Sequence, residues 1–147
     1  MAAIVSSAID DRPVYYAMTT QGFEELNLGG FLIRQGVAFK LNNGPVEADS
    51  ARGIHAVEDE RLAAFTGPFI DLPRTEMLVS EVFLHRGGFP EWGHWVDSAT
   101  EGIPYYYAYT HYGLSLIYQN QGRADLAQRH MAEAERFLDL AQKRRTE

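Results

Sequence analysis

The stretch Pro104–Arg144, PYYYAYTHYGLSLIYQNQGRADLAQRHMAEAERFLDLAQKR, decides the fold of this chain. It contains two helical patterns, Pro104–Asn120 and Arg123–Arg144, separated by a turn at Gln121-Gly122. Proline is favoured in the first turn of a helix and glycine just past a helix end, so these boundaries are well marked. The sequence therefore predicts a helical hairpin over residues 104–144.

Apolar residues of the second helix recur at steps of four and three positions, which places them on one helix face. The stripe consists of Ala127, Met131, Ala134, Leu138 and Ala141, with Phe137 beside it. Its alanines allow a neighbouring helix to approach closely. The first helix carries tyrosine, leucine and isoleucine on all sides, so we expect it to be covered from several directions.

Six residues of the hairpin have the spacing of a tetratricopeptide repeat: Leu114, Tyr118, Gly122, Ala127, Met131 and Ala134. The chain resembles that family over roughly residues 108–141, but His111 stands in place of its first aromatic residue and the closing proline is missing. Stacked repeats need about three units for independent stability. The resemblance implies that the rest of this chain, or another chain, covers the single repeat.

The first third of the chain predicts a small α/β element over residues 1–45. Val14–Thr19 and Val37–Leu41 are rich in strand-forming residues. Between them, Phe23–Gln35 has a helical pattern that is interrupted or capped around Gly29-Gly30, and Gly36 suits the position after a helix end. We therefore expect about two strands in this element.

The complete pattern predicts a mainly α (α+β) fold in one domain spanning residues 1–147. A helical part over residues 70–147 follows the α/β element and includes a helix around Met77–Phe83. A short helix is also expected at Glu58–Phe65. Asp71 and Asp97 each precede a predicted helix, so we expect them to act as helix caps.

A wider resemblance covers most of the chain. The phrases Asp11–Ala17 (DRPVYYA) and Gly30–Leu41 (GFLIRQGVAFKL) are similar to the soluble C-terminal part of bacterial membrane proteins of the DUF2723 group, which resemble protein O-mannosyltransferases. Gln35 stands where that group has a glutamate. The resemblance implies an extracytoplasmic domain with tetratricopeptide-like helices, and no catalytic residue to carry over, because the catalytic acid belongs to the membrane half.

Composition excludes several kinds of function. The 147 residues carry a net charge of −7, which argues against nucleic acid as the main partner, because phosphate binding needs a basic patch. Cysteine is absent, which excludes disulfides, thiolate nucleophiles and cysteine-based metal sites. No apolar run approaches the ~20 residues that span a bilayer, and Met1–Ile9 lacks the basic start of a signal peptide.

Motifs for catalysis are missing from the sequence. The five histidines show no HExxH or HxH spacing, so we predict no metal and no cofactor. His111 and His130 lie on adjacent helices of the hairpin and could meet, but we expect separate surface or half-buried histidines. A small hydrolase built on aspartate and histidine is the weakest of the hypotheses.

Aromatic residues cluster between Trp92 and Tyr118, more densely than one hairpin can bury. The candidate interface residues are Trp92, Trp95, Tyr105, Tyr106, Tyr109 and Tyr112. Tryptophan and tyrosine are favoured at protein interfaces, and their faces stack on sugar rings. We expect a non-catalytic binding or assembly module that holds a protein partner, a glycan or further copies of itself. The alternative is an accessory domain of a membrane glycosyltransferase that recognises a glycan or acceptor protein.

Overall fold

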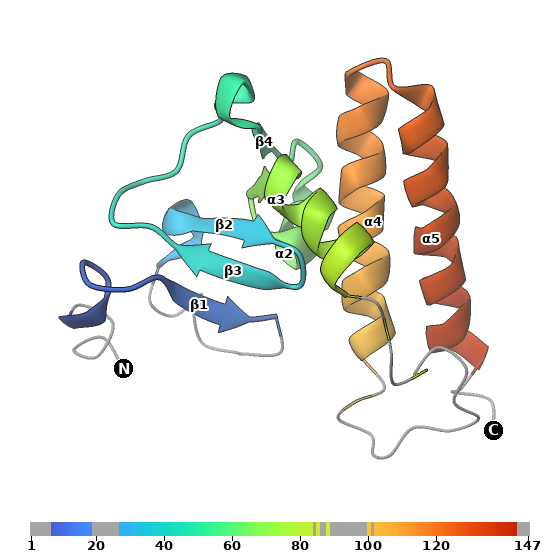
Figure 1. The fold of residues 1–147 in the computed structure, drawn as a ribbon, viewed down its shortest axis with the longest axis horizontal. Coiled ribbons are helices and arrows are strands. Elements are labelled where there is room, and N and C mark those ends of the chain that lie inside the picture. Colours follow the sequence, from blue (N-terminus) through green and yellow to red (C-terminus); the bar gives the residue numbers. More distant parts are fainter. Residues whose placement is uncertain are drawn as a thin grey trace. The chain divides into compact units, whose positions relative to one another are not determined.

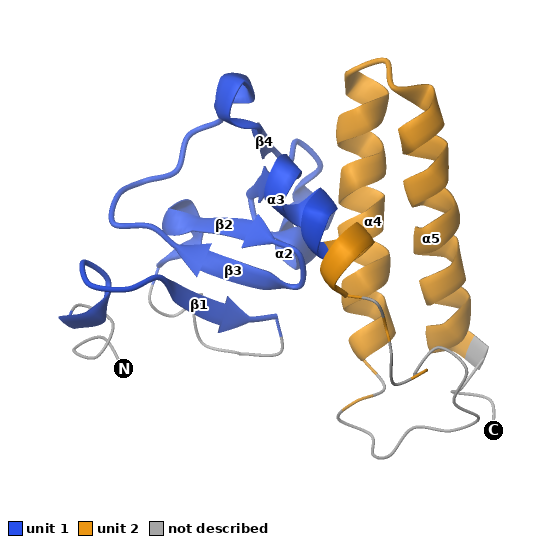
Figure 2. Ribbon diagram, viewed as in Figure 1, with its two compact units in different colours: residues 1–78 blue, residues 79–147 orange. Residues whose placement is uncertain are grey.

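The computed structural model describes residues 7–18, 27–83, 85, 88, 100 and 102–143. The chain divides into two compact units, residues 1–78 and residues 79–147 (Figure 2). Figure 1 shows that the first unit is built on a β-sheet and the second on two long helices.

Unit 1 contains a five-stranded mixed sheet with the strand order β1-β3-β2-β5-β4. The strands are β1 (Val14–Ala17), β2 (Leu32–Gln35), β3 (Ala38–Leu41), β4 (Ile54–Ala56) and β5 (Phe69–Asp71). Strands β2 and β5 pair in parallel, and the other pairs are antiparallel. The predicted fold class, a small element of about two strands followed by helices, is therefore wrong.

The expected helix Phe23–Gln35 is the main error. Its described part contains a short 3-10 turn, Gly29–Phe31, followed by strand β2. Gly36 has a φ of 64° and opens the two-residue turn that joins β2 to β3, where a glycine is favoured. A short apolar run fits a helix and a buried strand equally well. Its pairing with β3 and β5 makes this segment a strand.

Strands β4 and β5 lie in segments for which the sequence predicts no strand. Each has only three residues, too few to show the alternation of a half-buried strand. Both receive their partners from distant parts of the chain, since β5 lies beside β2 and β4 lies beside β5. Tertiary pairing defines these strands.

One face of the sheet is buried. It consists of Tyr16, Leu32, Arg34, Phe39, Leu41 and Ile70. These residues alternate with more exposed neighbours on β1, β3 and β5, whereas on β2 the intervening Ile33 is buried as well. Tyr16, Leu32, Phe39 and Leu41 form one apolar cluster. This face is the core of unit 1.

Arg34 is a buried charged residue within this core. Its Nε donates to the carbonyl oxygen of Gly36 at 2.9 Å, and its Nη1 donates to the carbonyl oxygen of Phe65 at 3.2 Å. Desolvation by burial lowers the pKa of Arg34 to about 9, so the guanidinium still carries its charge at neutral pH. Phe65 belongs to α2 (Glu60–Thr66), and Arg34 therefore connects the β2–β3 hairpin to this helix.

Helix α3 (Leu72–Met77) begins at Asp71, whose carboxylate accepts a hydrogen bond from the backbone nitrogen of Arg74 at 3.1 Å. The predicted capping role of Asp71 is confirmed, whereas Asp97 lies outside the described residues. After Met77 the chain continues as a π-helical turn, Leu78–Val82. Turns of this kind are rare and often occur at functional sites.

Unit 2 contains α4 (Ile103–Asn120) and α5 (Ala124–Lys143), which lie side by side (Figure 1). Gly122, with a φ of 72°, ends α4 as a C-terminal cap. The backbone nitrogen of Arg123 donates to the carbonyl of Tyr118 at 2.9 Å, and that of Gly122 donates to Gln119 at 3.0 Å. These two hydrogen bonds together form the Schellman motif, which reverses the chain between the helices.

The buried face of α5 differs from the predicted stripe. It consists of Ala127, His130, Ala134, Phe137 and Ala141. Met131 is half-buried and Leu138 is 37% exposed, so their predicted places in the contact are wrong. His130 and Phe137 occupy the contact because aromatic rings of α4 face them.

Gly67 tests the packing of unit 1. Its φ is 75°, and a Cβ added there would lie 2.7 Å from Cε1 of the core residue Phe39. We expect Gly67→Ala to lower the free energy of unfolding by about 2–4 kcal/mol, through backbone strain and overpacking together. Gly44→Ala is the control, because nothing lies within 4 Å of its added Cβ, and it should change little. Equal effects in urea denaturation would contradict this packing.

Candidate functional site

A column of five aromatic rings fills the contact between α4 and α5. Its members come alternately from the two helices: Tyr107, Phe137, His111, His130 and Tyr118. Successive ring centroids lie 5.0, 5.8, 5.2 and 5.5 Å apart, with interplanar angles of 23°, 11°, 26° and 14°. The column joins α4 between Tyr107 and Tyr118 to α5 between His130 and Phe137.

Helical periodicity brings these rings into line. On α4 they occur at intervals of four and seven residues, and on α5 at an interval of seven, so each set lies on one face. The helices also approach closely beside the column, where the Ser115 hydroxyl donates to the carbonyl oxygen of Ala127 at 2.8 Å. A small residue on each helix permits this contact.

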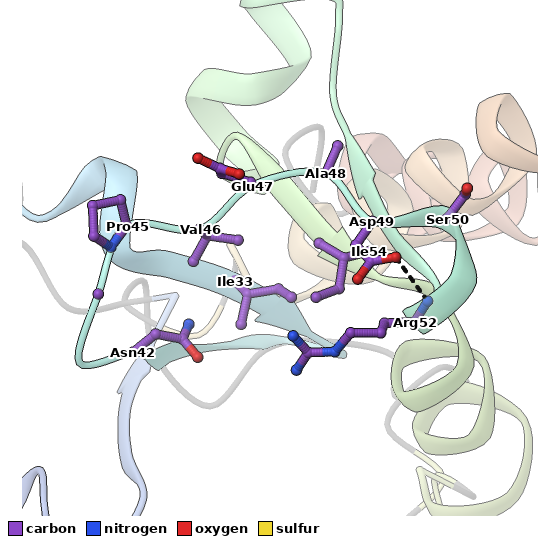
Figure 3. Close-up of a pocket in the computed structure, with 11 residues that line it drawn as sticks. Ile33, Asn42, Pro45, Val46, Glu47, Ala48, Asp49, Ser50, Arg52 and Ile54 are labelled. Atoms are coloured by element: carbon purple, nitrogen blue, oxygen red, sulfur yellow. Dashed lines mark hydrogen bonds between the residues drawn. The ribbon is translucent and has the colours of Figure 1, made fainter.

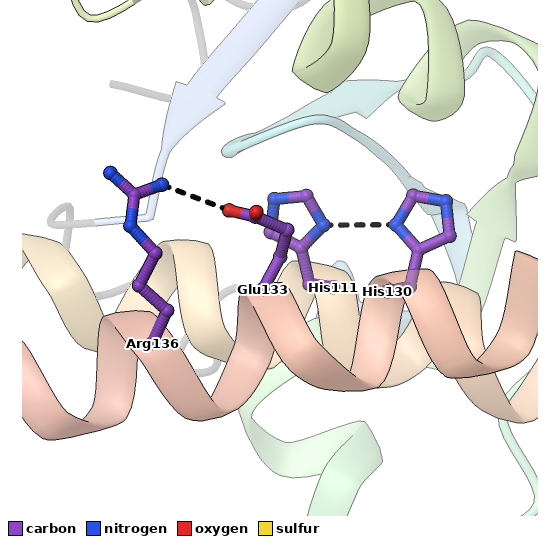
Figure 4. A network of polar contacts seen from close by, with 4 residues as sticks. All are labelled: His111, His130, Glu133 and Arg136. Carbon is purple, nitrogen blue, oxygen red and sulfur yellow. Dashed lines mark hydrogen bonds and ion pairs between the residues drawn. The ribbon is translucent and has the colours of Figure 1, made fainter.

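His111 and His130 form a direct hydrogen bond inside the column. Their Nδ1 atoms lie 2.9 Å apart, and the side chains are 6% and 1% exposed. The two rings meet edge to edge, with the Nδ1 atoms facing one another (Figure 4). The expectation of separate surface or half-buried histidines is therefore wrong for this pair. Intervals within each helix could suggest the contact, but the register between the helices decides it.

A pocket of about 210 Å³ opens over this histidine pair. We call it the histidine pocket; it is lined by Val79, Ser80, Phe83, His85, His111, Arg129, His130, Glu133, Arg136 and Phe137. All of these residues belong to unit 2. Sequence reasoning identified none of them as a site, because they come from three separate segments.

The charges of the histidine pocket are mainly positive. Among the described residues, two arginines line it, together with a single carboxylate, that of Glu133. Arg136 Nη1 lies 3.0 Å from Glu133 Oε2 (Figure 4). The Arg136 guanidinium also covers the Phe137 ring at 5.5 Å. Arg129 donates to the Ser80 hydroxyl at 3.4 Å, and among the described residues no carboxylate contacts it. Arg129 is therefore the cation most available to an incoming group.

Two backbone irregularities border the pocket. Val79 and Ser80 belong to the π-helical turn, and His85 has a φ of 46°, which is uncommon for residues other than glycine. His85 packs edge-on against Tyr107 at 4.8 Å and against Phe137 at 5.4 Å. Such strain often accumulates where a binding geometry is maintained.

Tyr107 is the first ring of the column, and burial raises its pKa above the ordinary value of 10.0. Phe83 packs against it edge-on at 6.1 Å, in addition to His85 and Phe137. This apolar surrounding disfavours the tyrosinate. The hydroxyl therefore stays protonated at neutral pH.

A second hollow of about 640 Å³ lies in unit 1, between β2 and the loop 42–54 (Figure 3). Ile33, Val46 and Ile54 supply apolar side chains, while Glu47, Asp49 and Arg52 supply charges of both signs. One of these charges serves the loop itself, since the Asp49 carboxylate accepts from the backbone nitrogens of Ala51 and Arg52. With Asp49 engaged by the loop, the other two charged side chains of the described lining, Glu47 and Arg52, have opposite signs.

Four of the predicted interface residues lie in α4. Tyr105, Tyr106, Tyr109 and Tyr112 are all half-buried, and none of them lines the histidine pocket. Tyr105, Tyr109 and Tyr112 share one helix face by their spacing. The other two candidates, Trp92 and Trp95, lie outside the described residues.

The part of the chain that the structure describes contains no cluster of three or more potential metal-binding side chains. In the same residues, no helix combines the length and the apolar character that crossing a bilayer requires.

Comparison with known proteins gives no relative. No family model matches the sequence, and neither a curated protein nor a solved structure resembles the chain significantly. The resemblances to tetratricopeptide repeats and to the DUF2723 group therefore remain predictions.

Because of Tyr107, we expect the free energy of unfolding to vary with pH in the alkaline range. In the unfolded chain its hydroxyl ionises near pH 10, whereas burial keeps it protonated to higher pH in the folded protein. The unfolded state alone then releases this proton, so stability decreases as the pH rises above about 10. Tyr107→Phe should lose less stability than the wild type between about pH 9 and 11 in urea denaturation. If the free energy of unfolding fell equally with pH in the two proteins, the burial of this hydroxyl would be contradicted.

Proposed function

We propose that this protein is a non-catalytic binding module, whose helical hairpin holds an acidic side chain of a partner protein in the histidine pocket. The observation that carries the proposal is the charge of this pocket. In its described lining, two arginines and three histidines stand against one carboxylate. An incoming carboxylate complements this arrangement, although the whole chain has a net charge of −7.

The volume of the pocket supports a small occupant. Pockets for drug-sized ligands measure about 300–1,000 Å³, whereas this one measures about 210 Å³. A volume of this size accommodates one side chain or a few waters, at ~30 Å³ for each water. A single acidic side chain from a partner surface fits better than a complete sugar or nucleotide.

The arginines can bind this group without losing a strong existing interaction. Arg129 has no carboxylate partner among the described residues, and its guanidinium offers paired donors that match a carboxylate. The existing pair between Arg136 and Glu133 is partly solvated, and such pairs contribute only about 0–1 kcal/mol. A partner carboxylate can therefore compete with Glu133 for Arg136.

Binding suits the histidines better than catalysis. A general base must reach a proton of its substrate, but the Nδ1 atoms of His111 and His130 are directed at one another. In this arrangement the pair stabilises the floor of the pocket.

The aromatic surface remains part of the proposal. The stripe of Tyr105, Tyr109 and Tyr112 offers a second contact area on α4, with a chemistry suited to a protein partner or to further copies of this chain. Glycan recognition as part of a membrane glycosyltransferase is the alternative function, and it depends only on the DUF2723 resemblance.

An acidic peptide tests the proposal. We expect the capped peptide GSDSG to shift the amide signals of Ser80, Arg129 and Glu133 in an NMR titration at low salt, whereas GSNSG should not. Arg129→Gln should weaken binding about tenfold, equivalent to about 1.4 kcal/mol, by removing the main donor.

Two further variants control this measurement. Arg123→Gln removes an exposed arginine outside the pocket and should leave affinity unchanged. Glu133→Gln removes the competing carboxylate and should strengthen binding. Equal binding of GSDSG and GSNSG, or shifts confined to other surfaces, would show that the pocket does not select acidic groups.

A further inference from the structure

We propose that the histidine pocket takes up one proton, on the His111–His130 pair, when it binds an acidic group. This inference depends on the proposed function and adds its regulation: the affinity for a carboxylate increases as the pH falls from about 8 to about 6. The pair then acts as a proton acceptor beneath the bound group.

The hydrogen bond limits the protons that the pair can hold. Each ring contributes Nδ1, and the two atoms lie 2.9 Å apart. One Nδ1 must donate and the other must accept, so only one proton occupies the line between them. While the bond persists, the pair is either neutral or carries one positive charge. A second proton would place two donors and two cations against each other, and would break the bond.

Positive charge predominates around the pair among the described residues of the empty pocket. Both rings are buried. Arg129 and Arg136 bring like charge to the same pocket, while His85 adds a third imidazole. Among the described residues that line the pocket, the one carboxylate is that of Glu133, which already pairs with Arg136.

The aromatic neighbours of the pair do not change the charge around it. Phe137 stacks on His111 at 5.8 Å, and Tyr118 stacks on His130 at 5.5 Å. Neither ring carries a charge at neutral pH. Among the described residues, Arg129, Arg136 and Glu133 are therefore the charged side chains that line the pocket with the pair.

A bound carboxylate changes the charge around the histidine pair. It neutralises the arginine that receives it and brings a negative charge to the pocket above the imidazoles. Opposite charge at short range favours the protonated form of a base. The single proton then converts the neutral hydrogen bond into a charge-assisted one, which is stronger. Binding of the anion and binding of the proton therefore support each other.

Thermodynamic linkage makes the effect measurable. When ligand binding takes up one proton, affinity changes by up to about tenfold for each pH unit. The carboxylate of GSDSG does not interfere, because an aspartate with an ordinary pKa of about 3.9 stays ionised over this range.

The experiment measures the affinity of GSDSG for the full chain by NMR titration at about pH 6, 7 and 8, with the imidazole signals recorded in the same samples. We expect binding to be about tenfold tighter at pH 6 than at pH 8. Addition of peptide at pH 7 should move the ring signals of His111 or His130 toward those of imidazolium.

The double variant His111→Gln/His130→Gln serves as the matched control. Two glutamine amides can hydrogen-bond to each other but do not titrate, so this variant should bind with an affinity independent of pH. If it does not fold, the imidazole signals of the wild type still decide the question.

The outcomes separate the two proposals. Absence of binding at every pH would overturn the proposed function. Binding that depends on Arg129 but is equally strong at pH 6 and pH 8, with unchanged imidazole signals, would overturn the proton uptake and leave the binding function intact.

Discussion

The column of rings between α4 and α5 is the constraint on which unit 2 depends. Five aromatic side chains alternate between the helices, and their spacing fixes the register at which α4 and α5 can pack. That register aligns His111 with His130 and brings Arg129 and Arg136 to the same pocket. The polar pocket is thus a consequence of the apolar contact beneath it, because the interior packs densely and leaves little freedom to shift.

In unit 1, buried hydrogen bonds rather than stacked rings join segments that are distant in the sequence. Arg34 sits in the buried face of the sheet and donates to carbonyl oxygens of the β2–β3 turn and of α2. The hydroxyl of Thr75 connects the same turn to α3, since it accepts from the nitrogen of Gly36 and donates to the carbonyl of Arg34. A buried guanidinium is costly unless its donors are satisfied. Its bonds hold together elements that are far apart in the sequence.

Local sequence signals predicted the features that depend on neighbouring residues. The turn at Gly122 and the cap at Asp71 follow from the conformational freedom of glycine and from the hydrogen-bonding reach of aspartate. The candidate site was less accessible to such signals. It combines a π-helical turn, one residue in a left-handed conformation and polar side chains from α4 and α5.

The sequence by itself determined two helices and the reversal between them, because periodicity, proline and glycine act within a few residues. It did not determine which face of α5 is buried, because Met131 and Leu138 are apolar and correctly spaced for a buried stripe and yet do not form it. The tertiary structure placed His130 and Phe137 there, opposite the rings of α4. Likewise, β4 and β5 became strands only through their partners, because three residues contain too little pattern of their own. Contacts between distant segments, which no local pattern records, decided the sheet and the pocket.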